Sequence, residues 1–386
     1  MLFRSQTITH DEFLDLLDYV YAPDHGPWFQ IAPGEVTISE NATDRFVLRF
    51  AETPEGRRPI ARYWKSVSDL GANDQKPLSG LKIALDPGHL GGQWAKLEER
   101  WFQNGSSTPV AEGDLALRVA QLLAPRLRDL GADVVFVRSK PGPVTNFRPS
   151  ELKAQASASL LDRGVMNILP SFSGPADPKR EFSVDWEADR LFYRIGEIHA
   201  RAGVVNDQLK PDLVLCLHFN AEPWGDPSKP TLVKANHFHL LVNGAYSLAE
   251  LAYDDERLAM LIKLLSRVYP EELGWAESIG QSLAAVTGLP PYSYATPNAR
   301  RAGNTGCVWA RNLLANRLYE CPVIYIEPYV MNNEEVFARI QAGEYEGLRN
   351  FGGVMRPNIY EEYVTGVAYG LAEYCRANRG KNSAQK

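Results

Sequence analysis

Two stretches of the sequence are apolar almost without interruption and rich in β-branched residues. They are PDLVLCLHF at residues 211–219 and PVIYIE at residues 322–327. Runs of this kind are typical of strands that are buried on both faces of a parallel or mixed sheet. Because helices must then cover both faces, these two runs favour an α/β architecture.

The chain from Leu81 onward alternates between strand and helix patterns. LKIALD (81–86) and ADVVFVRS (132–139) are apolar runs, and EGDLALRVAQLLAPRLRDLG (112–131) repeats apolar residues at helical spacing, which predicts a β-α-β unit. Four further segments have helical patterns: RLFYRIGEIHARAGVVND, ERLAMLIKLLSRVY, WAESIGQSLAAVTG and YEEYVTGVAYGLAEYCRA. We therefore predict a doubly wound fold with a mostly parallel or mixed twisted sheet and helices on both faces.

Residues 1–78 have a different pattern. Thr9 and Glu12 match a capping box at the start of a short helix, and short apolar runs follow at WFQIA, EVTIS and RFVLRFA. The polar stretch at 68–80 contains Gly and Pro and suits a linker. We predict a small N-terminal α+β domain over 1–78 and a larger domain over 79–380.

The larger domain contains an excursion at about 140–186 that interrupts the alternation. Pro-rich, loop-like sequence surrounds one possible helix, SELKAQASASLLDRG. Long excursions from compact domains are typically lids or binding loops. This segment is therefore expected to restrict or to build a binding groove.

Composition excludes several classes of protein. The net charge is -6, with acidic and basic residues interspersed, so no basic face for nucleic acid is predicted. No segment reaches the roughly 18 unbroken apolar residues of a membrane span. The four cysteines are too few and too scattered for a disulfide framework or a paired-cysteine zinc site, and Cys216 is expected to be a buried thiol. The N-terminal sequence lacks a secretory pattern, which leaves a cytoplasmic protein or a processed one.

Polar side chains follow three of the predicted strands at the point where each strand ends. His89 closes the DPGH turn after the first strand, His218 follows PDLVLCL, and Glu327 ends PVIYIE. Glu112 opens the helix after the first strand and so belongs to the same edge of the sheet. Ligand sites form at the carboxyl ends of strands in such sheets, so we expect these four residues to converge.

Two imidazoles and one carboxylate with an open fourth position are a common way to hold one catalytic Zn²⁺. His89, Glu112 and His218 are the predicted ligands, and Glu327 is the predicted base that takes a proton from water. Each residue also has a simpler interpretation. A histidine at a strand end is often only hydrogen-bonded, and a glutamate at a helix start often only complements the helix dipole. Glu327 is the exception, because an ionised carboxylate after an apolar strand needs a partner or a function.

Other residues compete for these roles. His237 and His239 in NHFHLLV lie two residues apart, hence on one face of a strand, where they could chelate zinc, pack across strands or contact substrate. Glu98 and Glu99 are alternatives to Glu112, but they lie in a charged, loop-like run.

Two further polar residues are expected to support the site. Asn220, just beyond His218, is expected to orient a ligand or the substrate. Asp86 is expected either to stabilise the DPGH turn or to act behind the ligands.

The motifs LKIALDPGHLGG, VAEGDLALRVAQLLAPRLRDLGADVVFVRS, PDLVLCLHFNAEP and WARNLLANRLYECPVIYIEPYVMNNEEV occur in that order. In content and order they resemble the zinc-dependent N-acetylmuramoyl-L-alanine amidase family of the amidase_3 type. The resemblance implies that His89, Glu112 and His218 bind zinc and that Glu327 is catalytic. The chain departs from the family pattern just after His89, His218 and Glu327, and these departures bear on pocket shape and substrate detail.

The resemblance implies a hydrolase that cuts the amide bond between N-acetylmuramic acid and L-alanine in peptidoglycan or muropeptides. It also implies a location in the cell envelope, periplasmic or extracellular. The ligand set alone is equally compatible with a zinc peptidase or amidase that acts on another amide bond. A cell-wall-binding protein that keeps the fold without catalysis is the third alternative.

Overall fold

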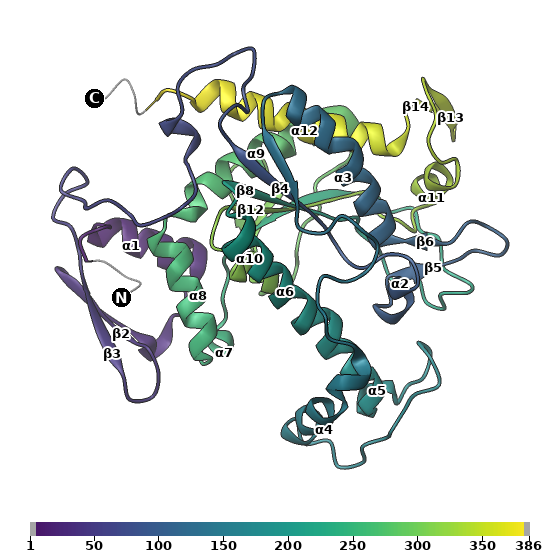
Figure 1. Ribbon diagram of the computed structural model, residues 1–386, viewed down its shortest axis with the longest axis horizontal. Helices are drawn as coiled ribbons and strands as arrows, with labels where there is room; N and C mark the ends of the chain where they lie inside the picture. The colour runs from purple at the N-terminus through teal and green to yellow at the C-terminus, as the bar shows by residue number, and fades with distance from the viewer. Residues whose placement is uncertain (1–4, 382–386) are drawn as a thin grey trace.

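A seven-stranded mixed sheet forms the centre of the computed structural model, which describes residues 5–381 (Figure 1). The strand order in space is β10-β11-β9-β12-β8-β4-β7. The strands are β4 (Lys82–Pro87), β7 (Asp133–Phe136), β8 (Leu213–Leu217), β9 (Phe238–Val242), β10 (Arg300–Ala302), β11 (Val308–Ala310) and β12 (Val323–Pro328). Strands β7, β4, β8 and β12 are parallel to one another, whereas β9 and β11 run in the opposite direction. The predicted mostly parallel or mixed sheet is confirmed.

Both faces of the sheet are apolar, which explains the uninterrupted runs in the sequence. Along β4, Ile83 and Leu85 pack on one face, whereas Ala84 packs on the other. In β8, Leu215 and Cys216 alternate in the same way, and the Cys216 thiol is buried as predicted. Side chains of successive strand residues point to opposite faces, so a strand covered on both sides must be apolar at every position.

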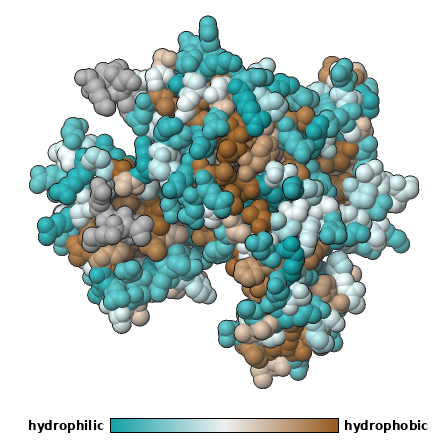
Figure 2. Space-filling model, in the orientation of Figure 1, coloured by the Kyte–Doolittle hydropathy of each residue, from teal (hydrophilic) through white to brown (hydrophobic). Residues whose placement is uncertain are grey.

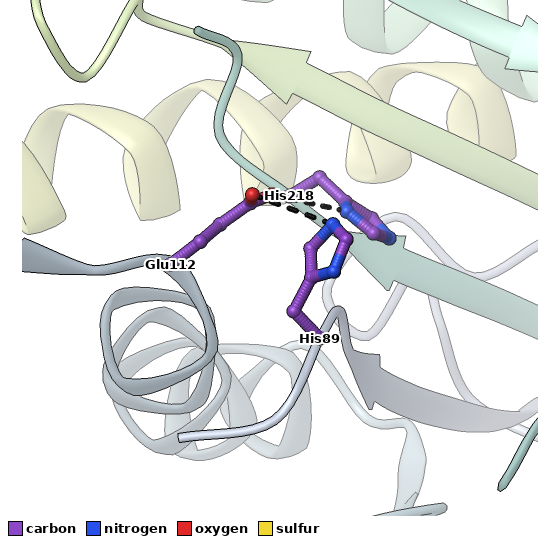
Figure 3. A group of neighbouring side chains, drawn as sticks. All are labelled: His89, Glu112 and His218. Atoms are coloured by element: carbon purple, nitrogen blue, oxygen red, sulfur yellow. Dashed lines mark hydrogen bonds and ion pairs between the residues drawn. The ribbon is translucent and has the colours of Figure 1, made fainter. Parts of the chain in front are cut away.

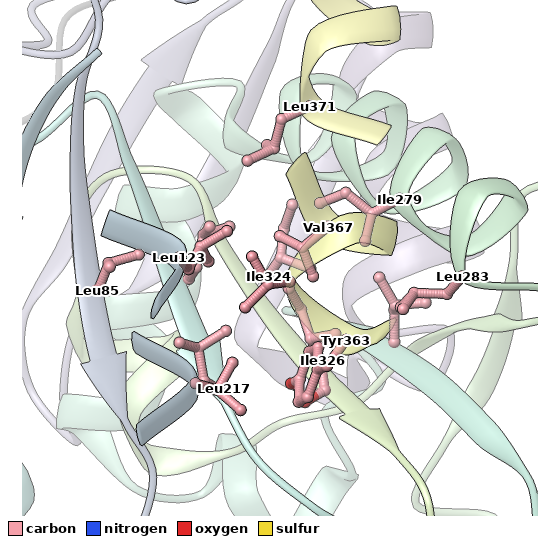
Figure 4. Packing of buried hydrophobic residues seen from close by; sticks show 14 of the residues in the cluster. Leu85, Leu123, Leu217, Ile279, Leu283, Ile324, Ile326, Tyr363, Val367 and Leu371 are labelled. Atoms are coloured by element: carbon pink, nitrogen blue, oxygen red, sulfur yellow. The ribbon is translucent and has the colours of Figure 1, made fainter. Parts of the chain in front are cut away.

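Three long helices cover one face. They are α3 (Glu112–Asp129), α9 (Val268–Thr287) and α12 (Ile359–Asn378). Figure 4 shows Leu123 of α3, Ile279 of α9 and Val367 of α12 meeting Ile324 of β12 in the core between helices and sheet. The predicted helix ERLAMLIKLLSRVY differs from the structure: α8 (Asp254–Leu265) ends earlier, because Arg267 adopts a left-handed conformation with φ 55° just before α9 begins.

The other face is covered by one long helical run and one short helix. The run comprises α5 (Val184–Arg190), a π-helical stretch (Leu191–Gly196), α6 (Glu197–Gly203) and a second π-helical stretch (Val204–Leu209). Ala202 and Val205 of this run pack against Val214 and Val323 of the sheet, and α10 (Leu314–Leu318) packs beside them. The predicted helices on both faces of the sheet are therefore confirmed.

The N-terminal region forms a small three-stranded antiparallel sheet with one helix. Its elements are α1 (His10–Leu16), a π-helical turn (Leu17–Tyr21), a 3-10 turn (Gly26–Trp28), β1 (Phe29–Ala32), β2 (Glu35–Ser39) and β3 (Arg45–Arg49). The capping box of Thr9 and Glu12 is present as predicted. The apolar core of this region, which includes Phe13 and Ile38, also contains Met260 and Leu264 of α8. The region is thus packed onto the main body through α8. The first four residues of the sequence lie outside the described part of the chain.

Residues 140–196, which we call the arm, extend away from the sheet (Figure 1). The arm contains a 3-10 turn (Pro149–Leu152), α4 (Lys153–Asp162), a second 3-10 turn (Arg180–Phe182), α5 and the first π-helical stretch. Its apolar side chains are unusually exposed: Leu161 is 64%, Met166 is 90% and Phe182 is 45% accessible. Hydrophobic atoms are visible at the free end of the arm in Figure 2.

Short elements complete the fold. They are α2 (Trp94–Leu97), α7 (Leu248–Leu251), α11 (Glu334–Gln341), a 3-10 turn (Val67–Asp69) and two hairpins, β5 (Trp101–Phe102) with β6 (Val110–Ala111) and β13 (Arg349–Phe351) with β14 (Val354–Arg356). Within residues 5–381, none of the helices combines the length and apolar character needed to cross a membrane.

Candidate metal centre

Three of the predicted site residues meet at the carboxyl edge of the parallel strands. His89 follows β4, His218 follows β8, and Glu112 is the first residue of α3. Figure 3 shows the three side chains pointing toward one another. One potential ligand atom from each lies within 4.8 Å of the others, and no other group of this kind occurs among the residues that the structure describes. The cluster is consistent with a metal-ion site of two imidazoles and one carboxylate.

The orientation of His89 is fixed by Glu98. Nδ1 of His89 lies 2.7 Å from Oε1 of Glu98, while the other carboxylate oxygen accepts a 2.6 Å hydrogen bond from the backbone N–H of Leu90. Nε2 is left facing Glu112, 3.3 Å from Oε2. A carboxylate behind a histidine is a usual arrangement at metal centres, because it fixes the ring orientation and tautomer. Glu98, an alternative to Glu112 as ligand, thus lies behind His89 and outside the three-residue cluster.

Glu112 is buried between the two histidines. Its Oε1 lies 3.2 Å from Nδ1 of His218 and accepts a 3.2 Å hydrogen bond from the backbone N–H of Phe219, and Nε of Arg100 lies 3.8 Å from Oε2. Burial alone raises the pKa of Glu112, but the two imidazoles and Arg100 outweigh burial and hold that pKa below its usual range.

His218 responds to the same charge. Burial lowers the pKa of its imidazole, but the carboxylate of Glu112 outweighs burial and raises that pKa above its usual value. The raised imidazole pKa and the lowered carboxylate pKa share a cause, which is the direct contact of Glu112 with His218.

The space for the His218 ring depends on Gly88 in the DPGH turn. A Cβ atom at position 88 would lie 2.2 Å from Cε1 of His218, so only glycine fits there. On its other side the ring stacks on Tyr325 of β12, with centroids 5.1 Å apart and planes inclined by 20°. The donor set and its spacing, together with this close-fitted ring, are consistent with a metal-ion site.

Asp86 lies beneath the DPGH turn in a buried ion-pair network. It accepts a 2.8 Å hydrogen bond from Arg201 and a 2.6 Å hydrogen bond from the Tyr319 hydroxyl. Arg201 also donates to the carbonyls of Pro87, at 2.9 Å, and His89, at 3.3 Å. Of the two expectations for Asp86, this geometry favours stabilisation of the turn, exerted through Arg201. Arg201 was not predicted from the sequence, because its role depends on a contact with Asp86, 115 positions away.

Glu327 reaches the same edge from β12 and is paired with His239. The two residues are opposite each other in the antiparallel pairing of β12 with β9, and Nε2 of His239 lies 3.3 Å from Oε2 of Glu327. Burial raises the pKa of Glu327, but His239 above all, with His218 and His89, lowers it to about 2. Glu327 is therefore ionised at neutral pH and keeps 20% of its side chain exposed.

His239 belongs to a polar chain that continues away from Glu327. Its Nε2 lies 2.9 Å from the hydroxyl of Tyr294, which in turn accepts a 3.3 Å hydrogen bond from Arg311. Nδ1 of His239 lies 3.3 Å from Nδ2 of Asn220. Asn220 thus contacts His239, whereas Tyr294 and Arg311 were not among the residues selected from the sequence.

His237 and Glu99 lie further out. His237 lies 3.3 Å from Glu222 and packs on the ring of Tyr292, with centroids 4.6 Å apart. Glu99 accepts a hydrogen bond from the indole N–H of Trp186 in the arm. Neither residue belongs to the three-residue cluster. In the described part of the chain, His237 and His239 do not form a second metal-binding cluster.

The cluster and Glu327 open into one cavity of about 660 Å³. Besides the three cluster residues and Glu327, the cavity is lined by Asn220 and Arg311 on the sheet side and by Arg190, Tyr193, Arg194 and Ile195 of the arm. A second hollow of about 520 Å³ shares Arg100 and Ala221 with it and includes Pro175 and Arg180 of the arm. The arm therefore forms part of the wall of an elongated cleft.

Comparison with known proteins gives structural likeness only. No family model matches the chain, and no curated protein matches it. Among solved structures, the chain is similar to the N-acetylmuramyl-L-alanine amidase Ami1 from Mycobacterium smegmatis, at 16% identity over 78% of this chain and 99% of that chain, with a TM-score of 0.41.

Two further solved structures are similar at the same level. The CwlD amidase from Clostridioides difficile, solved with the GerS lipoprotein, has 12% identity over 76% of this chain and 98% of that chain, with a TM-score of 0.41. The N-acetylmuramoyl-L-alanine amidase AmiC2 of Nostoc punctiforme has 14% identity over 80% of this chain and 99% of that chain, with a TM-score of 0.37. The likeness to this group concerns the fold.

Proposed function

We propose that the protein is a zinc-dependent amidase that hydrolyses the amide bond between N-acetylmuramic acid and L-alanine in peptidoglycan. The observation that carries the proposal is the convergence of His89, Glu112 and His218 within 4.8 Å, in one cavity with the ionised carboxylate of Glu327. This combination supplies both a cation site and a base, which amide hydrolysis requires.

In this proposal His89, Glu112 and His218 hold one zinc ion. When bound, zinc makes water more acidic and polarises the carbonyl of the amide. Glu98 keeps Nε2 of His89 facing the site by holding Nδ1, and Gly88 leaves room for the His218 ring. Arg201 holds the turn that carries His89, through two backbone carbonyls.

Glu327 is the proposed general base and acid. Its carboxylate accepts a proton from water as the water oxygen attacks the carbonyl carbon. It then gives that proton to the amide nitrogen as the carbon–nitrogen bond breaks, which yields a carboxylic acid, with the second water proton on its new oxygen, and a free amine. The pKa of about 2 keeps the Glu327 carboxylate ionised at neutral pH, so that it is free of a proton before it accepts one from water. His239, at 3.3 Å, fixes the carboxylate in place.

The choice of the peptidoglycan bond rests on the ordered motifs that resemble the amidase_3 type. The elongated cleft supports it, because two adjoining hollows of about 660 and 520 Å³ suit a substrate that extends on both sides of the reacting bond. With this substrate, we place the protein in the cell envelope. We also assign catalysis to residues 79–380 and leave residues 1–78 as a separate N-terminal domain.

The function is tested by metal analysis and by identification of products. We expect about one zinc per chain after purification, and release of intact stem peptides from muropeptides, detected by mass spectrometry. Cleavage within the peptide would instead identify a zinc peptidase or an amidase for another bond. Zinc binding without any hydrolysis would favour a cell-wall-binding protein.

The role of Glu327 is tested by Glu327→Gln. We expect zinc content to be unchanged and kcat to fall by about 10²- to 10⁴-fold, the usual contribution of a positioned base. The matched control is Glu222→Gln, which removes a carboxylate near the same edge that pairs with His237 and not with the cluster. If Glu327→Gln retains most of the wild-type kcat, another residue is the base.

A further inference from the structure

Four arginines line the cavity away from the metal cluster. Within the described part of the chain, two of them have an ion-pair partner, and two do not. Arg190 is paired with Glu187 at 2.8 Å, and Arg317 is paired with Glu256 at 2.8 Å. Arg194 and Arg311 line the same cavity, but neither has an ion-pair partner among residues 5–381. Within these residues, Arg194 and Arg311 therefore lack the direct ion-pair partner that Arg190 and Arg317 have.

The acidic residues that line the cavity pair with groups other than these two arginines. Asp86 and Glu197 pair with Arg201, whereas Glu98 pairs with His89. Glu112 and Glu327 face the histidines. The chain as a whole carries a net charge of -6, so two arginines without an ion-pair partner among the described residues in one cavity are a local feature. Such a feature attracts an anionic group into the cavity.

Arg311 is held in place while donors remain free. Its guanidinium donates one 3.3 Å hydrogen bond to the Tyr294 hydroxyl and lies 5.4 Å from the centre of the Tyr294 ring. A guanidinium has five N–H donors in a planar fork, which matches the two oxygens of a carboxylate. Arg194 contacts the ring of Tyr193 at 5.8 Å and is exposed at the arm side of the cavity.

We propose that Arg194 and Arg311 bind a free carboxylate of the substrate, located on the amine side of the bond that is cut. The proposal rests on the proposed function and names its substrate class: N-acylated peptides that carry a carboxylate close after the scissile amide. The amine side follows from the polar chain of Arg311, Tyr294, His239 and Glu327, because Glu327 delivers the proton to the departing amine.

The test uses two N-acetylmuramoyl peptides that are identical except next to L-alanine. In one, the residue after L-alanine carries a free α-carboxylate, and in the other this group is a carboxamide. For the zinc-loaded wild type, we expect a KM roughly 10- to 100-fold lower for the carboxylate peptide, with kcat similar, since hydrogen bonds to charged groups contribute this much. Arg311→Gln is expected to remove most of this preference, measured as the ratio of the two KM values, and Arg194→Gln a smaller part.

The matched control is Arg190→Gln. Arg190 lines the same cavity, but its charge is neutralised by Glu187, which keeps Arg163 at 2.9 Å as a partner in the variant. We expect the wild-type preference to persist. If Arg190→Gln loses the preference as fully as Arg311→Gln does, the effect is one of general charge and the assigned site is wrong.

A direct binding measurement separates this inference from the proposed function. Titration of the zinc-loaded Glu327→Gln variant with each peptide in a calorimeter should show tighter binding of the carboxylate peptide, even if hydrolysis fails. Equal Kd values for the two peptides overturn the inference. Preferential binding of the carboxylate peptide without hydrolysis by the wild type supports the inference and contradicts the proposed amidase.

Discussion

The N-terminal region and the arm both lie outside the main sheet, but they are built in opposite ways. The N-terminal region buries Phe13 and Leu17 completely and shares its core with α8. The arm leaves Met166 90% exposed and forms only a small apolar cluster around Phe192. Residues 5–78 contribute nothing to the lining of the cavity beside the metal cluster, whereas the arm contributes Arg190, Tyr193, Arg194 and Ile195.

The contrast assigns different roles to the two regions: the N-terminal region contributes to stability, and the arm contributes to substrate contact. A segment with a large buried core contributes to the free energy of unfolding of the whole body. A segment with few buried apolar contacts opens locally at low cost, which suits a wall that must admit a substrate. We infer that the N-terminal region stabilises the body through α8 and that the arm shapes the cleft.

The largest effect is expected from Phe13→Ala in the N-terminal core. Phe13 is 0% exposed and contacts the ring of Phe50, with centroids 5.4 Å apart. Loss of the ring should reduce the free energy of unfolding by about 3–5 kcal/mol, because transfer energy is lost and a cavity remains. Urea unfolding measures the change. Phe147→Ala in the arm, where the side chain is 55% exposed, is the control and should change stability by less than about 0.5 kcal/mol.

An intermediate, local effect is expected from Glu187→Gln in the arm. Glu187 is buried and accepts hydrogen bonds from Ser159, Arg163 and Arg190 at 2.7 to 2.9 Å. Loss of its charge should destabilise the packing of α5 on α4 by about 2 kcal/mol. Hydrogen exchange should become faster in α4 and remain unchanged in α1. Equal acceleration in both helices would show that the arm and the N-terminal region unfold together.

The smallest effect is expected from Asp189→Asn, and it depends on pH. Burial, together with the charges of Asp185 and Glu99, raises the pKa of Asp189 to about 7. Because the folded-state pKa lies above the unfolded value of roughly 3.9, the folded protein holds an extra proton between these values, and stability falls as pH rises from about 4 to 7.

Asn at position 189 removes this dependence. We expect the variant to be more stable than the wild type by about 1 kcal/mol above pH 7, a value reduced for partial exposure, and the difference to vanish below pH 4. Melting temperatures across this pH range provide the measurement. A constant difference at every pH would assign the effect to packing.

Much of the fold was predictable because its signals are local. The apolar runs of β8 and β12, the helical spacing of α3 and the capping box at Thr9 each depend on neighbours in the sequence. The positions of His89, His218 and Glu327 after their strands also follow from local pattern, because parallel strands bring their carboxyl ends to one edge. Their proximity therefore did not require knowledge of the complete structure.

Other parts of the site depend on contacts between distant segments. The pairing of His239 with Glu327 exists because β9 runs antiparallel to β12, a direction that the sequence left open. Glu98 lies behind His89 because a left-handed residue, with φ 55° at His89, turns the chain back toward α2. No local periodicity encodes either contact.

The sequence by itself determined which side chains the sheet would carry to its active edge, because alternation and burial along a strand are properties of a few consecutive residues. Only the tertiary structure decided what surrounds them: Arg201 beneath the turn, His239 beside Glu327, and Arg194 and Arg311 in one cavity. These arrangements follow from how whole elements pack, and packing energy depends on surfaces that are far apart in the chain.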